Sequence, residues 1–257
     1  MKIIISPAKK MNVDTDTMAV QGSPAFLSQT EVLLEWMRGL SREEAKKLWK
    51  CNDALTQLNY DRFREMDLEY NLTPALLSYE GIQYQYMAPH VFTEDAWEYV
   101  QKNLRILSGF YGVLKPLDGV TPYRLEMQAK VKSAGKKDLY EFWGSRLYDA
   151  LTKDRADGNP GKCTIMNLAS KEYSRCVEQY LQPGDRFVTC IFGEWKDGKV
   201  IQKGTQAKMA RGEMVRFMAE NRVETPEDIR GFDRMGYEFR PELSSDHEYI
   251  FVKKGVF

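Results

Sequence analysis

Helical and extended sequence patterns alternate along the chain, and this alternation limits the possible folds more than any other feature. The apolar residues 2–5 predict a first strand, and the first helical pattern covers residues 24–39. Further strands are expected at residues 162–168, 186–195, 199–203, 237–239 and 248–253. Helices are expected from the Ser41 capping box and at residues 53–66, 93–107, 138–151, 170–180 and 205–221. This mixture predicts an α/β (mixed α+β) fold with a central mixed sheet flanked by helices.

We expect one large domain over residues 1–257. Apolar residues make up 43% of the chain, which suffices for a sizeable core, and no repeat or Pro/Gly-rich linker divides it. The first apolar run ends at Pro7, too early for a secretory signal, and no window approaches the ~18 apolar residues that span a bilayer. We therefore expect a cytoplasmic protein without membrane contact, whose four cysteines are reduced.

The net charge of zero conceals a segregation of charge along the chain. Residues 53–98 have a net charge of −7, whereas residues 102–137 have +6 and residues 196–222 have +4. If the two basic segments meet in the fold, they form a local anion-binding surface on a neutral protein. The alternative is that acidic and basic surfaces pair with each other or are simply solvated.

Ser6, Lys9 and Lys10 directly follow the first predicted strand. Ligands of α/β proteins collect outside the carboxyl ends of strands, so a hydroxyl and two ammonium groups at this edge indicate an anion site. The segment has no glycine for close approach of the backbone to a phosphate, so it is not a P-loop. A solvated surface loop is the alternative interpretation.

Gly109 and Gly112 lie three residues apart after a predicted helix and are followed by Lys115. They suggest a tight turn whose backbone N–H groups face a phosphate, similar to the turn of a helix-hairpin-helix module. The spacing is one residue longer than usual, and Pro116 limits a second helix. The alternative is a glycine-rich turn placed for packing.

Arg124 and Glu126 are two positions apart, so in an extended segment both side chains project from the same face. The carboxylate can orient the guanidinium, act as a base, or form an ion pair, which is the commonest outcome. In the helix at residues 205–221, Lys208 and Arg211 share a stripe with apolar residues, whereas cations normally lie opposite. Either their stems extend along the edge of the core, or they reach into an enclosed anion site.

Metal binding and nucleophilic catalysis have no local motif. His90 and His247 are the only histidines, and the chain has no Cys-x-x-Cys or His-x-x-x-His pattern. We therefore expect no metal site and no cofactor. An all-carboxylate iron site in the acidic segment stays open as a minor alternative.

The chain resembles the YaaA peroxide-stress protein family over nearly its whole length. The matching pieces, in the family's order, are Ile5-Ser6-Pro7-Ala8-Lys9, Leu107-Ser108-Gly109, Tyr111-Gly112-Val113-Leu114-Lys115-Pro116-Leu117-Asp118, Pro122-Tyr123-Arg124-Leu125-Glu126-Met127, Asp138-Leu139-Tyr140, Asn167-Leu168-Ala169-Ser170 with Glu172-Tyr173, and Lys208 with Ala210-Arg211-Gly212. The resemblance implies a cytoplasmic bacterial protein that limits oxidative damage during hydrogen peroxide stress and is associated with lower unincorporated iron. It also implies binding of double-stranded DNA, with a helix-hairpin-helix-like element beside a basic cleft.

Family positions in that cleft correspond to Lys9, Arg124, Lys208 and Arg211, while Lys10 stands where the family more often has a small hydroxyl residue. The full set of expected DNA- or anion-binding residues is Ser6, Lys9, Lys10, Gly109, Gly112, Lys115, Arg124, Asn167, Lys208 and Arg211.

Two functions compete on this basis. The first is non-sequence-specific binding of double-stranded DNA by a protective protein. The second is an enzyme acting on a phosphate-bearing or nucleotide-like small molecule, with Glu126 as candidate general base and Asn167 orienting the ligand. Whether a reaction is catalysed, and the oligomeric state, stay open.

Overall fold

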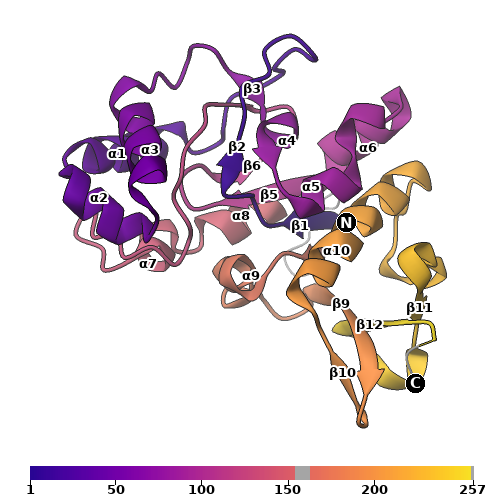
Figure 1. Cartoon of the computed structure of the whole chain (residues 1–257). Coiled ribbons are helices and arrows are strands. Elements are labelled where there is room, and N and C mark those ends of the chain that lie inside the picture. The colour runs from indigo at the N-terminus through magenta and orange to yellow at the C-terminus, as the bar shows by residue number, and fades with distance from the viewer. Residues whose placement is uncertain (154–162, 256–257) are drawn as a thin grey trace.

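The computed structural model describes residues 1–153 and 163–255 (Figure 1). Within these residues one mixed sheet of eight strands organises the fold. Its order is β11 (Tyr237–Phe239), β12 (Glu248–Lys253), β9 (Arg186–Lys196), β8 (Thr164–Leu168), β1 (Lys2–Ile5), β5 (Leu104–Ser108) and β6 (Gly112–Leu114), with β10 (Lys199–Ile201) paired to β9. The predicted α/β fold is confirmed, although Lys162 at the start of one predicted strand lies outside the described residues.

The middle of this sheet is parallel. β1 pairs in parallel with both β5 and β8, and β8, β9 and β12 continue the parallel arrangement, while β6, β10 and β11 are antiparallel to their neighbours. The strand order therefore reverses at β1, which has β5 on one side and β8 on the other. Such a reversal opens a crevice at the carboxyl ends of the strands, here after Ile5 and Leu168.

Helices cover the sheet and form a separate group at one end. Figure 1 shows α1 (Leu27–Arg38), α2 (Arg42–Trp49) and α3 (Asp53–Glu65) clustered away from the β9–β10 hairpin, which extends from the opposite side. The remaining helices are α4 (Ala75–Ser78), α5 (Ile82–Met87), α6 (Glu94–Asn103), α7 (Leu139–Trp143), α8 (Arg146–Thr152), α9 (Lys171–Glu178) and α10 (Gly204–Glu220). Two small ladders join β2 (Lys10–Met11) to β4 (Tyr79–Glu80) and β3 (Thr73–Pro74) to β7 (Gly119–Val120). No described helix is long and apolar enough to cross a membrane.

The long helix α10 packs against α5, α6 and β9. It comes close to α5 at Gly212, where an added Cβ would lie 2.1 Å from the carbonyl oxygen of Gln83. Only a residue without a side chain permits this contact. The glycine thus fixes the spacing between α5 and the face of α10 that carries Arg211.

The helix predicted over residues 93–107 is wrong in its last four residues. Thr93 caps the helix as its sequence suggests, but α6 ends at Asn103 and the chain continues as β5. β5 pairs with β1 through Ile4 and Arg105, and with β6 on its other side. Pairing on both edges outweighs the local helical pattern, because it satisfies the backbone of a fully buried segment.

The helix predicted over residues 138–151 is interrupted. Gly144 has a φ of +53°, in the left-handed region, and separates α7 from α8. Glycine adopts this conformation at little cost, so the chain turns here although apolar residues continue the helical spacing.

Gly109 begins the turn that joins β5 to β6, and Gly112 is the first residue of β6, so both glycines belong to a β-hairpin. Phe110 and Tyr111 between them are fully buried. This segment is therefore not the turn between two helices that its glycine spacing suggested, since strands flank it on both sides.

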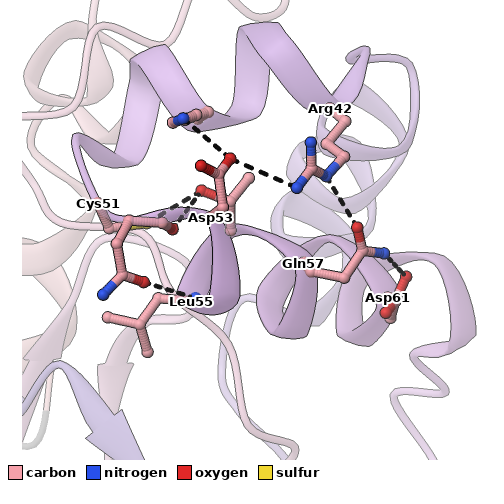
Figure 2. A network of polar contacts seen from close by, with 9 residues as sticks. Arg42, Cys51, Asp53, Leu55, Gln57 and Asp61 are labelled. Carbon is pink, nitrogen blue, oxygen red and sulfur yellow. Dashed lines mark hydrogen bonds and ion pairs between the residues drawn. The ribbon is translucent and has the colours of Figure 1, made fainter.

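Two helices joined by a short turn do occur at α2 and α3. Figure 2 shows the polar contacts that hold this pair: Asp53 contacts Arg42 and Lys46, and Gln57 bridges Arg42 to Asp61. The predicted capping box at Ser41 and Glu44 is confirmed at the start of α2. All of these contacts are exposed, so each stabilises the helix pair only slightly.

Candidate anion-binding site

A cavity of about 430 Å³ opens where the strand order reverses. Its walls come from the segment after β1, the start of α5, the loop around Arg124, the start of α9 and one face of α10. Five cations and three carboxylates are among the described residues that line it, namely Lys9, Lys10, Arg124, Lys208 and Arg211 with Glu80, Glu126 and Glu172. Side chains that are far apart in the sequence thus line one cavity, in which cations outnumber carboxylates.

Glu126 is the centre of an ion-pair network on one side of the cavity. Its Oε1 lies 3.1 Å from Lys9 Nζ and 3.4 Å from Arg124 Nη2. The side chains of Arg124 and Glu126 are only 11% and 13% exposed, whereas that of Lys9 is 67% exposed. The expected same-face relationship of Arg124 and Glu126 holds, although the segment is not a strand. Near it, Lys10 pairs with Glu80.

Hydroxyl groups join the ends of β1 and β8. Ser6 Oγ lies 3.2 Å from Ser170 Oγ and accepts the Ser170 backbone N–H at 2.8 Å. The Tyr84 hydroxyl donates to the Ser6 carbonyl at 3.0 Å, which ties α5 to the same point. These contacts hold the segment after β1 and the N-terminal end of α9 together at the carboxyl edge of the sheet.

Lys208 and Arg211 lie one turn apart on α10 and line the cavity together with Gln83 of α5. Lys208 is exposed at the rim, while Gln83 is only 7% exposed. Gln83 Nε2 and the Nε atoms of Arg211 and Arg124 are buried without a hydrogen-bond partner in the part of the chain that the structure describes. Buried donors without acceptors are uncommon, so three around one cavity indicate a place for an acceptor group.

Burial shifts the pKa values of a carboxyl and a guanidinium group in the cavity. Loss of hydration raises the pKa of the Glu172 carboxyl, against the opposing hydrogen bond from the Gln128 backbone N–H at 3.2 Å. Loss of hydration also lowers the pKa of the Arg211 guanidinium. Both shifts disfavour the charged form and would be reversed in part by a ligand of complementary charge.

Four of the expected site residues lie outside the cavity. An added Cβ at Gly109 would meet the backbone of residues 125–127, and Gly112 packs under Phe26 and Trp143, so both glycines serve close packing. Lys115 lines a different pocket beside Asp118. The Asn167 amide, which is 4% exposed, donates to Thr189 and accepts the backbone N–H of Ala169, and it is not among the residues that line the cavity.

The cavity contains residues that sequence patterns did not single out as site residues. Gln83, Tyr84, Ser170, Glu172 and Tyr173 line it together with Ser6 and the cations. Ser170 and Glu172 open a helix directly after the strand neighbouring β1, and that position could have identified them. Gln83 has no comparable sequence feature, because only the packing of α5 on α10 brings it to the cavity.

The two basic segments converge only in part. Arg124, Lys208 and Arg211 meet in the cavity, but Arg222 pairs with Asp95 and Arg216 with Glu220 elsewhere on the surface. Lys203 likewise pairs with Glu194. Among the described residues no group of three or more His, Cys, Asp or Glu side chains could hold a metal ion.

Comparison with known proteins identifies close relatives. A sequence model of the family described as peroxide stress protein YaaA matches residues 1–243. A UPF0246 protein of Agathobacter rectalis is 55% identical over 254 residues, which cover 99% of each chain. A UPF0246 protein of Lachnoclostridium phytofermentans is also 55% identical, over 98% of this chain and 96% of its own, and one of Pediococcus pentosaceus is 53% identical over 98% of each.

Proposed function

The chain belongs to the peroxide stress protein YaaA family, and from this premise we propose that it limits iron-dependent oxidative damage in the cytoplasm by binding double-stranded DNA through the cationic cavity and its rim. One observation supports this proposal above all others. Lys9, Arg124, Lys208 and Arg211, which come from three distant parts of the chain, line the same cavity. A scattered arrangement would have left no anion-binding surface on a neutral protein.

The helix pair α2–α3 provides a second contact surface next to this cavity. The indole Nε1 of Trp49, at the end of α2, donates to the Arg124 carbonyl at 2.6 Å and so attaches the pair to a cavity residue. Lys47 and the turn residue Lys50 are exposed. We propose that this pair is the helix-hairpin-helix-like element that the family resemblance implies, and that these lysines contact phosphates.

A physical route leads from DNA binding to protection against iron. DNA condenses cations on its phosphates, and a protein that neutralises phosphates with Lys and Arg releases them. Ferrous iron is such a cation. Where it is bound, it gives one electron to hydrogen peroxide, whose O–O bond breaks to yield a hydroxyl radical and a hydroxide ion, and the iron becomes ferric. Displacing it from DNA moves the radical chemistry into solution, so the protein needs no metal site of its own for this effect.

The test is a fluorescence-anisotropy titration of a fluorescein-labelled duplex at several salt concentrations. We expect binding that weakens steeply with salt, with a slope reduced by roughly one when Lys9→Gln or Lys208→Gln removes a phosphate contact. Lys199→Gln on the exposed β9–β10 hairpin is the matched control and should leave the slope unchanged. Absence of salt-sensitive binding at low ionic strength would refute the proposal.

A second candidate function is favoured by the depth of the site. Arg124 is 11% exposed beside Glu126, and the Nε atoms of Arg124 and Arg211 are buried, as in a pocket for a small phosphate-bearing substrate. In this alternative Glu126 acts as general base while the cations hold the phosphate. Glu126→Gln would then abolish turnover and preserve binding, and the alternative fails if no nucleotide in a panel raises the melting temperature.

A further inference from the structure

Donors and acceptors are distributed unequally between the two walls of the cavity. The wall formed by α5 and α10 contributes Gln83, Lys208 and Arg211 as its polar side chains besides the Tyr84 hydroxyl, and no carboxylate. The carboxylates Glu126 and Glu172 belong to the other side, in the loop after Tyr123 and at the start of α9, while the third carboxylate, Glu80 in β4, pairs with Lys10. A ligand that satisfies both walls therefore needs two chemically different ends.

The α5–α10 wall requires an acceptor. Gln83 is 7% exposed, and neither its Nε2 nor Arg211 Nε has a hydrogen-bond partner among the described residues. Lys208, exposed at the rim one turn before Arg211, adds a second positive charge. Amide, guanidinium and ammonium groups in one part of the lining suit a phosphate, which offers several acceptor oxygens and more than one negative charge.

The other side offers carboxylate acceptors beside its cations Lys9 and Arg124. An ionised carboxylate only accepts hydrogen bonds, and it repels a second anion. Glu126 shares its Oε1 with Lys9 and Arg124, while the Glu172 carboxylate receives the Gln128 backbone N–H. The raised pKa of Glu172 reflects burial that a neutral N–H donor could relieve. A bare phosphate or an internal stretch of DNA backbone has no such donor.

The size and walls of the cavity add a third requirement. Its volume of about 430 Å³ lies in the range of pockets that enclose small organic ligands. Tyr84, Tyr123 and Tyr173 contribute aromatic surface to the lining. A planar ring system with N–H groups on its edge, joined to a phosphate, meets all three requirements.

We propose that this cavity binds one nucleoside phosphate, with the phosphate on Lys208, Arg211 and Gln83 and the N–H edge of the base on Glu126 and Glu172. The ligand can come from two sources, of which the second is a nucleotide displaced from a DNA strand. For this second source the inference deepens the proposed function and rests on it. The first source is a free mononucleotide. Both present the same chemistry to the cavity.

Isothermal titration calorimetry with the whole chain tests the inference directly. The probes are the four deoxynucleoside 5′-monophosphates, the corresponding nucleosides and inorganic phosphate. We expect at least one monophosphate to bind tenfold or more tightly than both its nucleoside and inorganic phosphate, because only it engages both walls. The inference is overturned if no monophosphate binds, or if inorganic phosphate binds as tightly as the best of them.

Variants assign the two ends of the ligand. Lys208→Gln changes an exposed side chain, so it should weaken the monophosphate about fivefold without affecting the fold or the nucleoside. Glu172→Gln should weaken the monophosphate and leave inorganic phosphate unchanged. Lys199→Gln is again the control. Equal effects of Lys208→Gln and Lys199→Gln on the monophosphate would refute the assignment of the phosphate end.

A duplex with one unpaired 2-aminopurine separates this inference from the proposed function. If the base enters the cavity, its fluorescence changes on binding, and the favoured monophosphate reverses the change. Binding of monophosphate without duplex binding would retain the cavity assignment and refute the DNA function. Duplex binding with neither a fluorescence change nor monophosphate binding would refute the cavity assignment and retain the DNA function.

Discussion

Lys9 and Glu126 form an ion pair of 3.1 Å in which the two partners differ sharply in exposure. The lysine is 67% exposed and the glutamate 13%, so the cation covers the carboxylate from the solvent side. Arg124 reaches the same oxygen from the interior at 3.4 Å. Glu126 therefore offsets two of the cations that an incoming phosphate would use, and it sets how strongly the cavity attracts an anion.

Glu126→Gln should raise the affinity for duplex DNA. The amide has the same shape but no longer neutralises Lys9 and Arg124, so we expect binding about three- to tenfold tighter at low salt. The salt dependence should become steeper by up to roughly one phosphate equivalent. Fluorescence anisotropy measures both quantities. Glu178→Gln, which removes the exposed partner of Lys171 outside the cavity, is the control, and equal affinities of the two variants would contradict this role of Glu126.

Gly212→Ala should destabilise the protein and damage the cavity together. A Cβ at this position would lie 2.1 Å from the Gln83 carbonyl oxygen, so α5 and α10 must separate. We expect a loss of about 2–4 kcal/mol in the free energy of unfolding, measured by urea denaturation. Gly204→Ala lies on the same helix with no atom within 4 Å of the new Cβ and should be close to neutral. Similar stabilities of the two variants would show that the helices tolerate separation.

Asp118 should make the fold more stable as the pH falls from 7 to 5. Burial raises the pKa of its carboxyl to about 6 in the folded protein, above its ordinary value of 3.8, and the residue is 4% exposed. The folded state therefore takes up a proton before the unfolded chain does, which contributes about 1 kcal/mol over this interval. Asp118→Asn removes the contribution. As the pH falls from 7 to 5, the unfolding free energy of the wild type should rise by that amount relative to the unfolding free energy of Asp118→Asn. A difference between the two proteins that is constant with pH would refute the assignment.

Cys176 and Cys190 should resist peroxide in the folded protein. Each is 1% exposed, and burial raises the pKa of each thiol to about 12. The thiolate, which is the form that reacts with peroxide, is therefore scarce at neutral pH. Mass spectrometry after peroxide treatment should find both cysteines unmodified, and should find them oxidised when the same treatment follows unfolding in urea. Sulfinic acid at either residue in the folded protein would contradict this expectation.

The sequence predicts correctly those elements whose structure is decided by residues that are neighbours in the chain. The strands expected at residues 186–195 and 199–203 are joined as a hairpin, β9 to β10, with positive φ at Asp197 and Gly198 as a two-residue turn of this kind requires. The capping box at Ser41 and the two C-terminal strands were also correctly predicted. In each case neighbouring residues contain the turn chemistry, the cap or the alternation that decides the structure.

The errors occurred where the deciding partner is distant in the sequence. Residues 104–107 have helical spacing, yet they pair with β1 about a hundred positions earlier and become β5. Gly109 and Gly112 have the spacing of a phosphate-binding turn, yet the backbone at residues 125–127 and the ring of Trp143 occupy the space beside them. Local patterns contain no information about such neighbours.

The sequence by itself determined the family, the α/β class and the residue types that an anion site would use, including Lys9, Arg124, Lys208 and Arg211. Tertiary structure alone decided that these four residues line one cavity, that Gln83 and Glu172 belong with them, and that Asn167 does not. The physical reason is that strand order and the contact at Gly212 set which distant side chains meet. Charge along a chain is a local property, whereas an electrostatic site depends on distances that exist only after folding.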